Sequence, residues 1–517
     1  MPTALSRWLG IAAPLATGAM IAASWLDFAL YPLAWIAFVP LLLALDRAAT
    51  RREALRIGWI AGLATNIPAF YWLVYTIHVF GGFPYALALF FYGALSLFSA
   101  AEFALFAWGF HRLRFGPLGL AVPLLWVALE FLYPNLFPWH MANSQLEAPL
   151  LMQSGDLAGP YLLSFVMVWC SAGVVFALRT PRRWAPLGAA LSAALLLVGY
   201  GLWRMPQIQT AIDAAPHVAV GLVQGNIGFK QKGDVAMFDV NLDTYRQLSA
   251  PLQGQVDVLI WPESVEQHWL PADSDVVPKK YHPYPGTQAH LIYGGLAFEY
   301  PEAGGEPFMY NSAFLVDGDG RVFGRYDKHV LIPFGEYIPG GGLIPGLYDL
   351  SPQTSHFTPG GKIATLDVPD TLRVAPLICY EDVPASIARA MTGAGAEALL
   401  TIFNDAWFGD SMAPYQHEAI ALWRAIENRR YFVRVGNAGV TGVIDPFGRV
   451  LGRLGMFTAE TLRADVRPLH VETVYTRVGD VFGWAVVAVA VLCLVRTRRR
   501  PAAVASAPPS SAAPQGE

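Results

Sequence analysis

The sequence predicts a multi-pass α-helical membrane bundle joined to an extramembrane α/β domain. Of its 517 residues, 54% are hydrophobic and only 14% are charged, and the mean hydropathy is +0.39. That composition is typical of a membrane protein. Eight apolar runs are long enough to cross a bilayer, which takes about 20 helical residues each. A long polar segment interrupts them, in which short β-branched runs alternate with helical patterns, as expected for an α/β domain.

The eight predicted spans place seven helices before the polar domain and one after it. A cleaved signal peptide is the alternative for the first run, but the second run follows at once and favours a retained helix. The expected organisation is a bundle over 1–205, the polar domain over 215–471, an eighth helix over 479–496 and a disordered Ala, Pro and Ser-rich tail over 501–517. The spans fall near 8–25, 28–45, 57–78, 84–110, 117–133, 160–178, 185–203 and 480–495.

Arginine placement predicts the orientation of the bundle. The loops over 81–83 and 133–159 contain neither Lys nor Arg. Positive charge collects on the cytoplasmic side of membrane proteins, so we expect both termini in the cytoplasm and the polar domain outside, with Arg204 as a lone exception. The arginines that follow the even-numbered spans include Arg51, Arg112, Arg182 and Arg499.

Within the polar domain the pattern predicts a substantial mixed sheet. Hairpin turns are expected at Asp317–Gly320 and Asp445–Gly448. Helices are expected over 236–252, 383–392 and 414–428. The predicted strands cover 218–223, 256–261, 289–294, 312–317, 373–378, 398–403 and 431–437.

Composition also limits the partners. The formal net charge is −4, and the sequence contains no basic patch for nucleic acid and no zinc or phosphate-loop spacing. We therefore expect no nucleic acid partner, no metal and no cofactor.

Cys379 is the only cysteine of the polar domain, because Cys170 and Cys493 lie in apolar runs. It ends a predicted buried strand and precedes an acidic turn and a helix. A thiol at such a place is expected to be exposed and favoured as a thiolate. The alternative is a buried, inert cysteine.

Glu263 and Lys328 complete a set of groups for acyl transfer. Glu263 follows an apolar strand and Pro262, and Lys328 is one of only six lysines, all in this domain. A carboxylate can take the thiol proton, the sulfur can attack a carbonyl, and an ammonium can stabilise the oxyanion. The alternatives are a helix cap for Glu263 and a surface hairpin for Lys328.

Four motifs around these residues resemble the nitrilase superfamily, whose Glu-Lys-Cys triad lies on an αββα sandwich. Over its full length the chain resembles the apolipoprotein N-acyltransferase family, through VQGNI at 223–227, QHEAIALWRAIENRR at 416–430 and NAGVTGVIDPFG at 437–448. One departure is Lys232-Gly233, where the family usually has Lys-Trp; Phe229 or Trp269 could replace the tryptophan. The superfamily motifs are WPES at 261–264, RYDKHVLIPFGEYIP at 325–339, LICYED at 377–382 and NDAWFGDS at 404–411.

The resemblance implies a bacterial inner-membrane enzyme, monomeric, with its catalytic domain in the periplasm. It implies that Cys379 takes the sn-1 acyl chain of a membrane phospholipid as a thioester and passes it to the α-amino group of a diacylglyceryl-cysteine at the N-terminus of an apolipoprotein. Glu336 corresponds to an auxiliary glutamate that would keep Lys328 protonated. The Tyr380 amide is a candidate oxyanion donor. Glu381 is either auxiliary or a first-turn carboxylate.

Loops are expected to admit lipid. The segments 269–284 and 338–348 combine aromatic, apolar and glycine residues, which suits a lid that dips into the bilayer. Candidate substrate contacts are Trp269, Leu343, Ile344 and Leu347, with Ser144 and Gln145 in a loop below the site. The alternative for 338–348 is an ordinary surface loop.

Two rival functions share these features. A membrane-tethered amidase or nitrilase would give the thioester to water with the same triad, and the bundle speaks against it as a costly platform for a soluble substrate. A receptor or permease that keeps the sandwich only for binding would not need all three groups.

Overall fold

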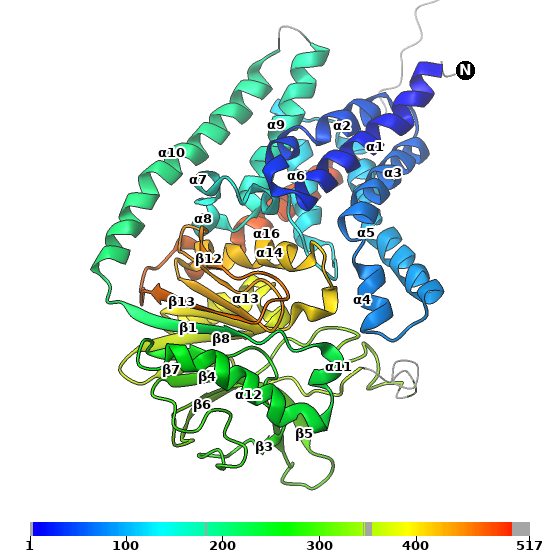
Figure 1. Ribbon diagram of the computed structural model, residues 1–517. Helices are drawn as coiled ribbons and strands as arrows, with labels where there is room; N and C mark the ends of the chain where they lie inside the picture. Colours follow the sequence, from blue (N-terminus) through cyan, green and yellow to red (C-terminus); the bar gives the residue numbers. More distant parts are fainter. Residues whose placement is uncertain (1–3, 181–182, 345, 347–353, 499–517) are drawn as a thin grey trace, which may run out of the picture.

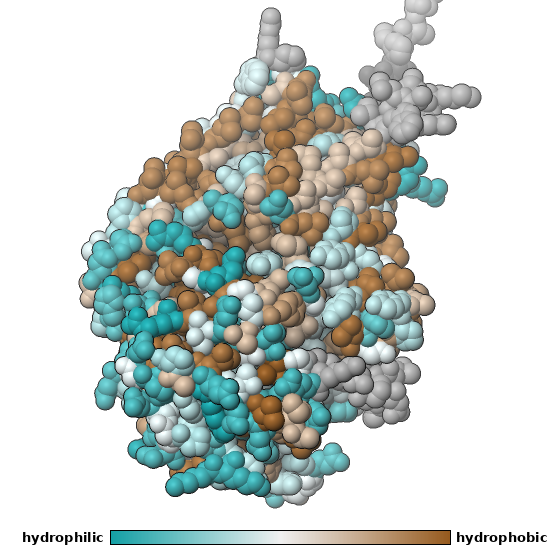
Figure 2. Space-filling view, viewed as in Figure 1, coloured by the Kyte–Doolittle hydropathy of each residue, from teal (hydrophilic) through white to brown (hydrophobic). Residues whose placement is uncertain are grey.

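The structure is a computed structural model that describes residues 4–180, 183–344, 346 and 354–498. A helical bundle packs onto two stacked β-sheets, and the first residues of the α/β domain follow directly from the long helix α10 (Figure 1). Figure 2 shows apolar surface gathered over the bundle and hydrophilic surface over the sheets. The division into an apolar helical part and a polar α/β part is therefore as predicted.

The bundle contains helices of very different lengths. Short 3₁₀ segments, η1 (Phe28–Trp35), η2 (Pro117–Gly119) and η3 (Met141–Gln145), connect or extend them. The helices are α1 (Ala4–Leu26), α2 (Phe38–Arg47), α3 (Arg51–Ala69), α4 (Leu73–Val79), α5 (Tyr85–Leu113), α6 (Ala121–Leu132), α7 (Pro149–Met152), α8 (Gly155–Ala158), α9 (Tyr161–Arg179), α10 (Ala185–Ala214) and, at the other end of the chain, α16 (Val481–Arg498).

Several of these helices could cross a membrane by length and composition. In the described part of the chain, four segments meet both criteria, and α3 with α4 forms a further candidate that is bent by 57°. Shorter apolar helices cover Gly10–Leu26, Pro117–Leu132 and Val481–Thr497. Each of the eight predicted runs therefore contains apolar helix.

The bend between α3 and α4 carries a contact to the α/β domain. The α3 helix ends at Ala69, one residue after Pro68, and leaves carbonyl groups without intrahelical partners. Gln416 fills this gap, because its amide donates to the carbonyl of Ala69 at 3.0 Å and its oxygen accepts from the Trp72 indole at 2.9 Å. The break thus positions the bundle on helix α14 (Ala413–Asn428) of the α/β domain.

The end of α10 differs from the sequence prediction. The predicted bundle boundary lay at Met205, where the apolar pattern stops, but the helix continues to Ala214. Backbone hydrogen bonding does not require apolar side chains, so a helix continues past the apolar run when its polar end is solvated. The extra turns lead directly into β1.

Two β-sheets, one of seven strands and one of six, form the core of the α/β domain. The orders are β13-β1-β2-β4-β5-β6, with β3 also paired to β4, and β12-β11-β10-β9-β8-β7. The strands are β1 (Val218–Gln224), β2 (Val258–Ile260), β3 (Trp269–Pro271), β4 (His290–Glu299), β5 (Phe308–Val316), β6 (Val322–Asp327), β7 (Leu366–Val368), β8 (Leu372–Ile378), β9 (Ala398–Phe403), β10 (Phe432–Gly436), β11 (Gly442–Ile444), β12 (Val450–Arg453) and β13 (Glu460–Val466).

All seven predicted strands are present, and both predicted turns join hairpins. The six strands that the pattern missed are β3, β6, β7, β11, β12 and β13, which are short or lie toward sheet edges. Such strands lack the continuous apolar run of a buried central strand. The β1–β13 pair in particular joins two segments about 240 residues apart, which local pattern cannot show.

Helices cover the outer faces of the two sheets. Helix α12 packs against β1, whereas α13 and α14 lie between the second sheet and the bundle (Figure 1). The described helices of this domain are α11 (Phe229–Lys232), α12 (Phe238–Ser249), α13 (Ala385–Gly393), α14 (Ala413–Asn428) and α15 (Val474–Val478).

Candidate active site

Strand direction brings the predicted catalytic groups to one place. Strand β2 is parallel to β4. Strand β5 is antiparallel to both β4 and β6, so β6 also runs parallel to β2. The carboxyl ends of β2 and β6 therefore lie at the same edge of the sheet. Glu263 follows β2 and Lys328 follows β6. The Lys328 Nζ atom lies 3.6 Å from Glu263 Oε1. Cys379 follows β8 of the other sheet, and its thiol interacts electrostatically with both groups.

Glu336 is the closest carboxylate to Lys328. Its Oε2 atom lies 2.8 Å from Lys328 Nζ, and the lysine side chain is only 1% exposed. Burial opposes the charged form, but the carboxylates of Glu336 and Glu263 raise the pKa of Lys328 above its ordinary value. The lysine is therefore an ammonium group at neutral pH, and its positive charge suits it to stabilise an oxyanion.

Asn311 was not predicted from the sequence, yet it orders both carboxylates. Its side-chain amide nitrogen donates to Glu263 Oε1 at 2.8 Å and to Glu336 Oε1 at 3.1 Å. It lies in β5, within a run that shows no local motif. Only the pairing of β5 with its neighbours brings it to the site.

The Cys379 thiol differs from the exposed thiolate that the sequence suggested. The residue is partly buried, and burial together with the negative charge of Glu263 raises its pKa well above the ordinary value, although Lys328 opposes this. The resting thiol is thus protonated, because a low-dielectric setting disfavours the thiolate. A base has to remove the proton during the reaction.

The backbone at Cys379 adopts an uncommon conformation. Its φ angle is 53°, in the left-handed region, where a residue with a side chain is disfavoured and where such conformations often occur at functional sites. The residue begins the 3₁₀ segment η7 (Cys379–Asp382) at the end of β8. The sharp change of direction presents the sulfur at the strand end.

Glu381 connects the cysteine segment to the lysine segment. Its Oε1 atom accepts hydrogen bonds from the Tyr326 hydroxyl and from the amides of His329 and Val330, at 2.7 to 3.0 Å. Its Oε2 atom accepts from the Ile378 amide at 2.9 Å. The side chain is fully buried. Glu381 therefore acts through other residues, by holding the backbone on either side of Lys328 and Cys379 together.

Lys232 places a second ammonium beside the site. It donates to the main-chain carbonyl of Glu263 at 2.8 Å. Burial lowers its pKa to about 8, while Glu263 and Cys379 act in the opposite direction. The sequence drew attention to this position only as a departure from a family pattern, and assigned the lysine no role.

A buried charged cluster supports the η7 segment from below. His417 donates to Asp382 Oδ1 at 2.7 Å and lies 3.3 Å from Asp405, and Arg434 pairs with the other oxygen of Asp382. Burial lowers the pKa of His417, but the two carboxylates outweigh this and raise it to about 9. The family motifs named in the sequence analysis include Asp382, Asp405 and His417. The sequence did not indicate that these three side chains pair with one another.

An apolar cavity of about 260 Å³ adjoins this site. Pro333 and Phe334, from the loop between Lys328 and Glu336, form part of its wall. Helices α3, α4 and α5, the bend between α3 and α4, and the loop near Leu136 form the rest. The Tyr380 hydroxyl donates to the carbonyl of Leu136 at 2.8 Å, so the residue next to the nucleophile contacts the wall of the cavity.

The predicted lid residues are strongly exposed where the structure describes them. Leu343 is 90% exposed and Ile344 60% exposed, which is unusual for large apolar side chains in water. Trp269 lies on the short strand β3, partly exposed, with its ring near Phe357. Leu347 lies outside the described residues.

Ser144 and Gln145 do not fit the predicted contact with substrate. Both are buried in the bundle. Gln145 accepts from the Trp35 indole and donates to the carbonyl of Tyr31, and Ser144 donates to the carbonyl of Met141. Gln145 therefore links η3 to η1 and Ser144 bonds within η3, because a buried polar group needs a partner.

Among the described residues, no group of three or more His, Cys, Asp or Glu side chains is arranged to hold a metal ion. The acidic groups at the site are instead paired with Lys328 and Asn311.

The chain matches two family models, described as "Apolipoprotein N-acyltransferase N-terminal domain" over residues 17–173 and "Carbon-nitrogen hydrolase" over residues 219–475. An apolipoprotein N-acyltransferase of Geobacter metallireducens is 35% identical over 505 residues, covering 94% of each chain. One of Azotobacter vinelandii is 36% identical over 503 residues, again covering 94% of each. Among solved structures, Saccharomyces cerevisiae Nit3, of the nitrilase superfamily, is 20% identical with a TM-score of 0.36, covering 51% of this chain and 94% of that one.

Proposed function

From the finding that the chain belongs to the apolipoprotein N-acyltransferase family, we propose that it moves an acyl chain from a membrane phospholipid to an apolipoprotein. The sn-1 chain of the phospholipid is taken up as a thioester on Cys379. It then passes to the α-amino group of a diacylglyceryl-cysteine at the N-terminus of the acceptor. Catalysis is assigned to Glu263, Lys328 and Cys379.

One observation carries this proposal: the loop that follows Lys328 and leads to Glu336 also lines an apolar cavity between bundle helices. The loop that joins Lys328 to Glu336 contributes Pro333 and Phe334 to that cavity. A soluble amide substrate would have little use for such a wall, whereas a hydrocarbon chain gains free energy by leaving water there. This favours the transferase over a membrane-tethered amidase.

In the first half-reaction Glu263 takes the proton of the Cys379 thiol, and the sulfur attacks the ester carbonyl. The Lys328 ammonium stabilises the oxyanion, with the Tyr380 amide as a second donor. The carbon–sulfur bond forms as the carbon–oxygen ester bond breaks. Glu263 returns the proton to the departing glycerol oxygen, so a lysophospholipid leaves.

In the second half-reaction the neutral α-amino group of the acceptor attacks the thioester carbonyl. The same oxyanion donors act again. Glu263 takes a proton from the nitrogen and delivers it to the sulfur, so the carbon–nitrogen bond forms as the carbon–sulfur bond breaks. Glu336 and Asn311 are assigned to positioning, since they hold Lys328 and Glu263 through contacts of 2.8 to 3.1 Å.

Entry of lipid is assigned to the segment around Leu343 and Ile344, together with Trp269 on β3. Their exposure supports insertion into the bilayer surface, where apolar side chains lose contact with water. Leu347 belongs to the same proposed lid.

The proposed topology has eight spans, with both termini in the cytoplasm and the α/β domain in the periplasm of a bacterial inner membrane. Arg204 would then lie on the outer side, and its pairing with Asp156 at 2.8 Å supports its tolerance there, because the charge is matched locally. The boundaries are 1–214 for the bundle, 215–471 for the catalytic domain and 479–496 for the last helix, and the enzyme acts as a monomer.

A reporter that is active only outside the cytoplasm tests this orientation. Fused after Gly304 it should be active, and fused after Arg500 it should be silent. The opposite pattern would place the catalytic groups on the wrong side for an exported acceptor.

The reaction itself is tested with a phospholipid that carries a labelled sn-1 chain. Without acceptor, the label should remain on Cys379 in a form that hydroxylamine releases, and lysophospholipid should appear in equal amount. A diacylated lipopeptide with a free amine should then take the label into a hydroxylamine-resistant amide, whereas an N-acetylated lipopeptide should not. Rapid release of free fatty acid without labelled lipopeptide would establish a hydrolase instead.

A further inference from the structure

A second cavity, of about 310 Å³, lies where the helical bundle meets the α/β domain. Tyr200, Trp203 and Arg204 of α10 line one side of it, and the segment Glu472–Arg477 lines the other. It shares no lining residue with the cavity beside the Lys328 loop. It is therefore a separate site, and the proposed reaction makes no use of it.

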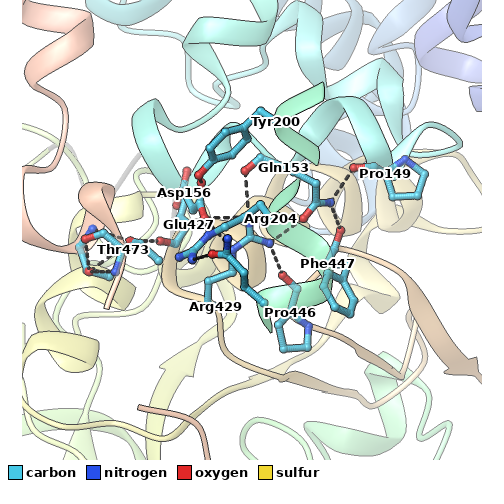
Figure 3. Close-up of polar contacts among 12 residues, drawn as sticks. Pro149, Gln153, Asp156, Tyr200, Arg204, Glu427, Arg429, Pro446, Phe447 and Thr473 are labelled. Carbon is cyan, nitrogen blue, oxygen red and sulfur yellow. Dashed lines mark hydrogen bonds and ion pairs between the residues drawn. The ribbon is translucent and has the colours of Figure 1, made fainter. Parts of the chain in front are cut away.

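The floor of this cavity is a charged network that joins the two parts of the protein (Figure 3). The carboxylate of Asp156 accepts from Arg204 Nε at 2.8 Å, from the Tyr200 hydroxyl at 2.6 Å and from Arg429 Nε at 3.0 Å. Arg429 is fully buried and also donates to the side-chain and main-chain oxygens of Gln153. A single carboxylate thus serves two guanidinium groups.

Asp156 is shared by Arg204 and the buried Arg429, and Glu472 pairs with Arg477, so these five groups together carry one net positive charge. Arg204, Arg429 and Arg477 bring three positive charges, and Asp156 and Glu472 bring two negative charges. Arg429 is buried behind Asp156, so it cannot recruit a counterion from solvent as an exposed arginine can. An anion in the cavity would reach Arg204 and Arg477 and would supply the missing negative charge.

The rim of the cavity is apolar on the side of α10. Trp203 is 59% exposed, and Val474 lies half-exposed on the opposite side. Tryptophan and arginine side by side at the end of an apolar helix are typical of the zone where lipid headgroups meet acyl chains. A free inorganic anion would use the guanidinium groups but not this apolar rim.

We propose that this cavity binds the headgroup phosphate of a membrane glycerophospholipid through Arg204 and Arg477, with the acyl chains along the exposed face of α10. Planar guanidinium groups match the geometry of phosphate oxygens, and such charge-assisted hydrogen bonds are strong. This lipid is distinct from the acyl donor, so the site goes beyond the proposed reaction.

The test measures how tightly the full-length protein in detergent binds dioleoylphosphatidylglycerol, by native mass spectrometry. A Cys379→Ala background prevents turnover of the lipid. We expect the Arg204→Gln/Arg477→Gln double variant to bind one lipid about tenfold more weakly, because two charge-assisted contacts are lost. Arg463→Gln is the matched control, since this arginine is also exposed and paired with a neighbouring carboxylate; it should bind like the parent.

Two further ligands identify the source of the phosphate. Dioleoylglycerol, which has the same chains without phosphate, should not displace the lipid, and neither should inorganic phosphate at millimolar concentration. Displacement by dioleoylglycerol would mean that only the chains are bound, and displacement by phosphate alone would mean a free-anion site; either result overturns the proposal.

The single variant Arg477→Gln controls for misfolding of the double variant. Its side chain is 71% exposed and lies outside the buried network, so its loss should not affect folding. It should weaken binding of one lipid about threefold while the unfolding temperature without lipid stays at the parent value. Parental affinity in both the single and the double variant would contradict the proposed site.

Discussion

The ammonium group of Lys232 donates a hydrogen bond to the main-chain carbonyl of Glu263, at 2.8 Å. This contact joins the segment after β1 to the catalytic base, and it depends on a lysine whose burial lowers its pKa to about 8. Loss of the proton above that pH would remove both a positive charge near Cys379 and part of the support of Glu263.

We therefore predict that acyl transfer declines as the pH rises through about 8. Lys232→Arg, which keeps the charge, should move this decline upward by at least one pH unit. Lys232→Met should lower kcat about tenfold at pH 7 and flatten the decline. Lys362→Arg, an exposed lysine, is the control. An unchanged alkaline limb in Lys232→Arg would separate Lys232 from the pH dependence.

The triad variants should lose activity as a unit. Cys379→Ala, Glu263→Gln and Lys328→Ala should each lower kcat by a factor of about 10³ or more, because nucleophile, base and oxyanion donor act in the same step. Glu336→Gln should have a smaller effect, of about 10- to 100-fold, since Glu263 still pairs with Lys328. The rate at which labelled acyl chain passes from phospholipid to lipopeptide measures this, with membrane insertion checked separately. Ordinary turnover by any triad variant would show that the residue has another role.

His417 should make stability depend on pH. Its pKa in the folded protein is about 9, above the ordinary value of about 6.5 in an unfolded chain. Its protonated form therefore stabilises the fold fully below about pH 6.5, and the contribution is lost as the pH rises through about 9. The full effect is on the order of 3 kcal/mol. Thermal unfolding in detergent from pH 6 to 10 should show a decline that His417→Gln lacks. A parallel decline in both proteins would refute this assignment.

The exposed lid should matter for bilayer lipid and not for the chemistry. Replacing Leu343 and Ile344 with serine should slow acylation by phospholipid in vesicles about tenfold, while a short soluble ester reacts at the parental rate, because the triad is untouched. Leu451→Ser, another exposed leucine on the α/β domain, is the control. An equal loss with both substrates would indicate a structural role for this loop.

The sequence alone determined the parts of the protein that follow from local pattern. Apolar runs located the helices, and continuous β-branched runs located the central strands, because burial on both faces excludes polar residues from them. Glu263 and Cys379 could be found because each follows such a strand, and Lys328 because lysine is scarce and lies in a distinctive motif. Edge strands such as β13 and the last turns of α10 escaped, since neither needs an apolar run.

Only the tertiary structure decided how the site works, because its contacts join residues far apart in the chain. Asn311 meets Glu263 across 48 positions, and Glu381 meets Tyr326 across 55. The same is true of the Cys379 thiol, whose pKa is raised by burial and by the charge of Glu263, a residue of the other sheet. Ser144 and Gln145 were predicted to contact substrate because they are polar residues of a loop. In the structure they are buried and hydrogen-bond to other residues of the bundle, as buried polar groups generally do.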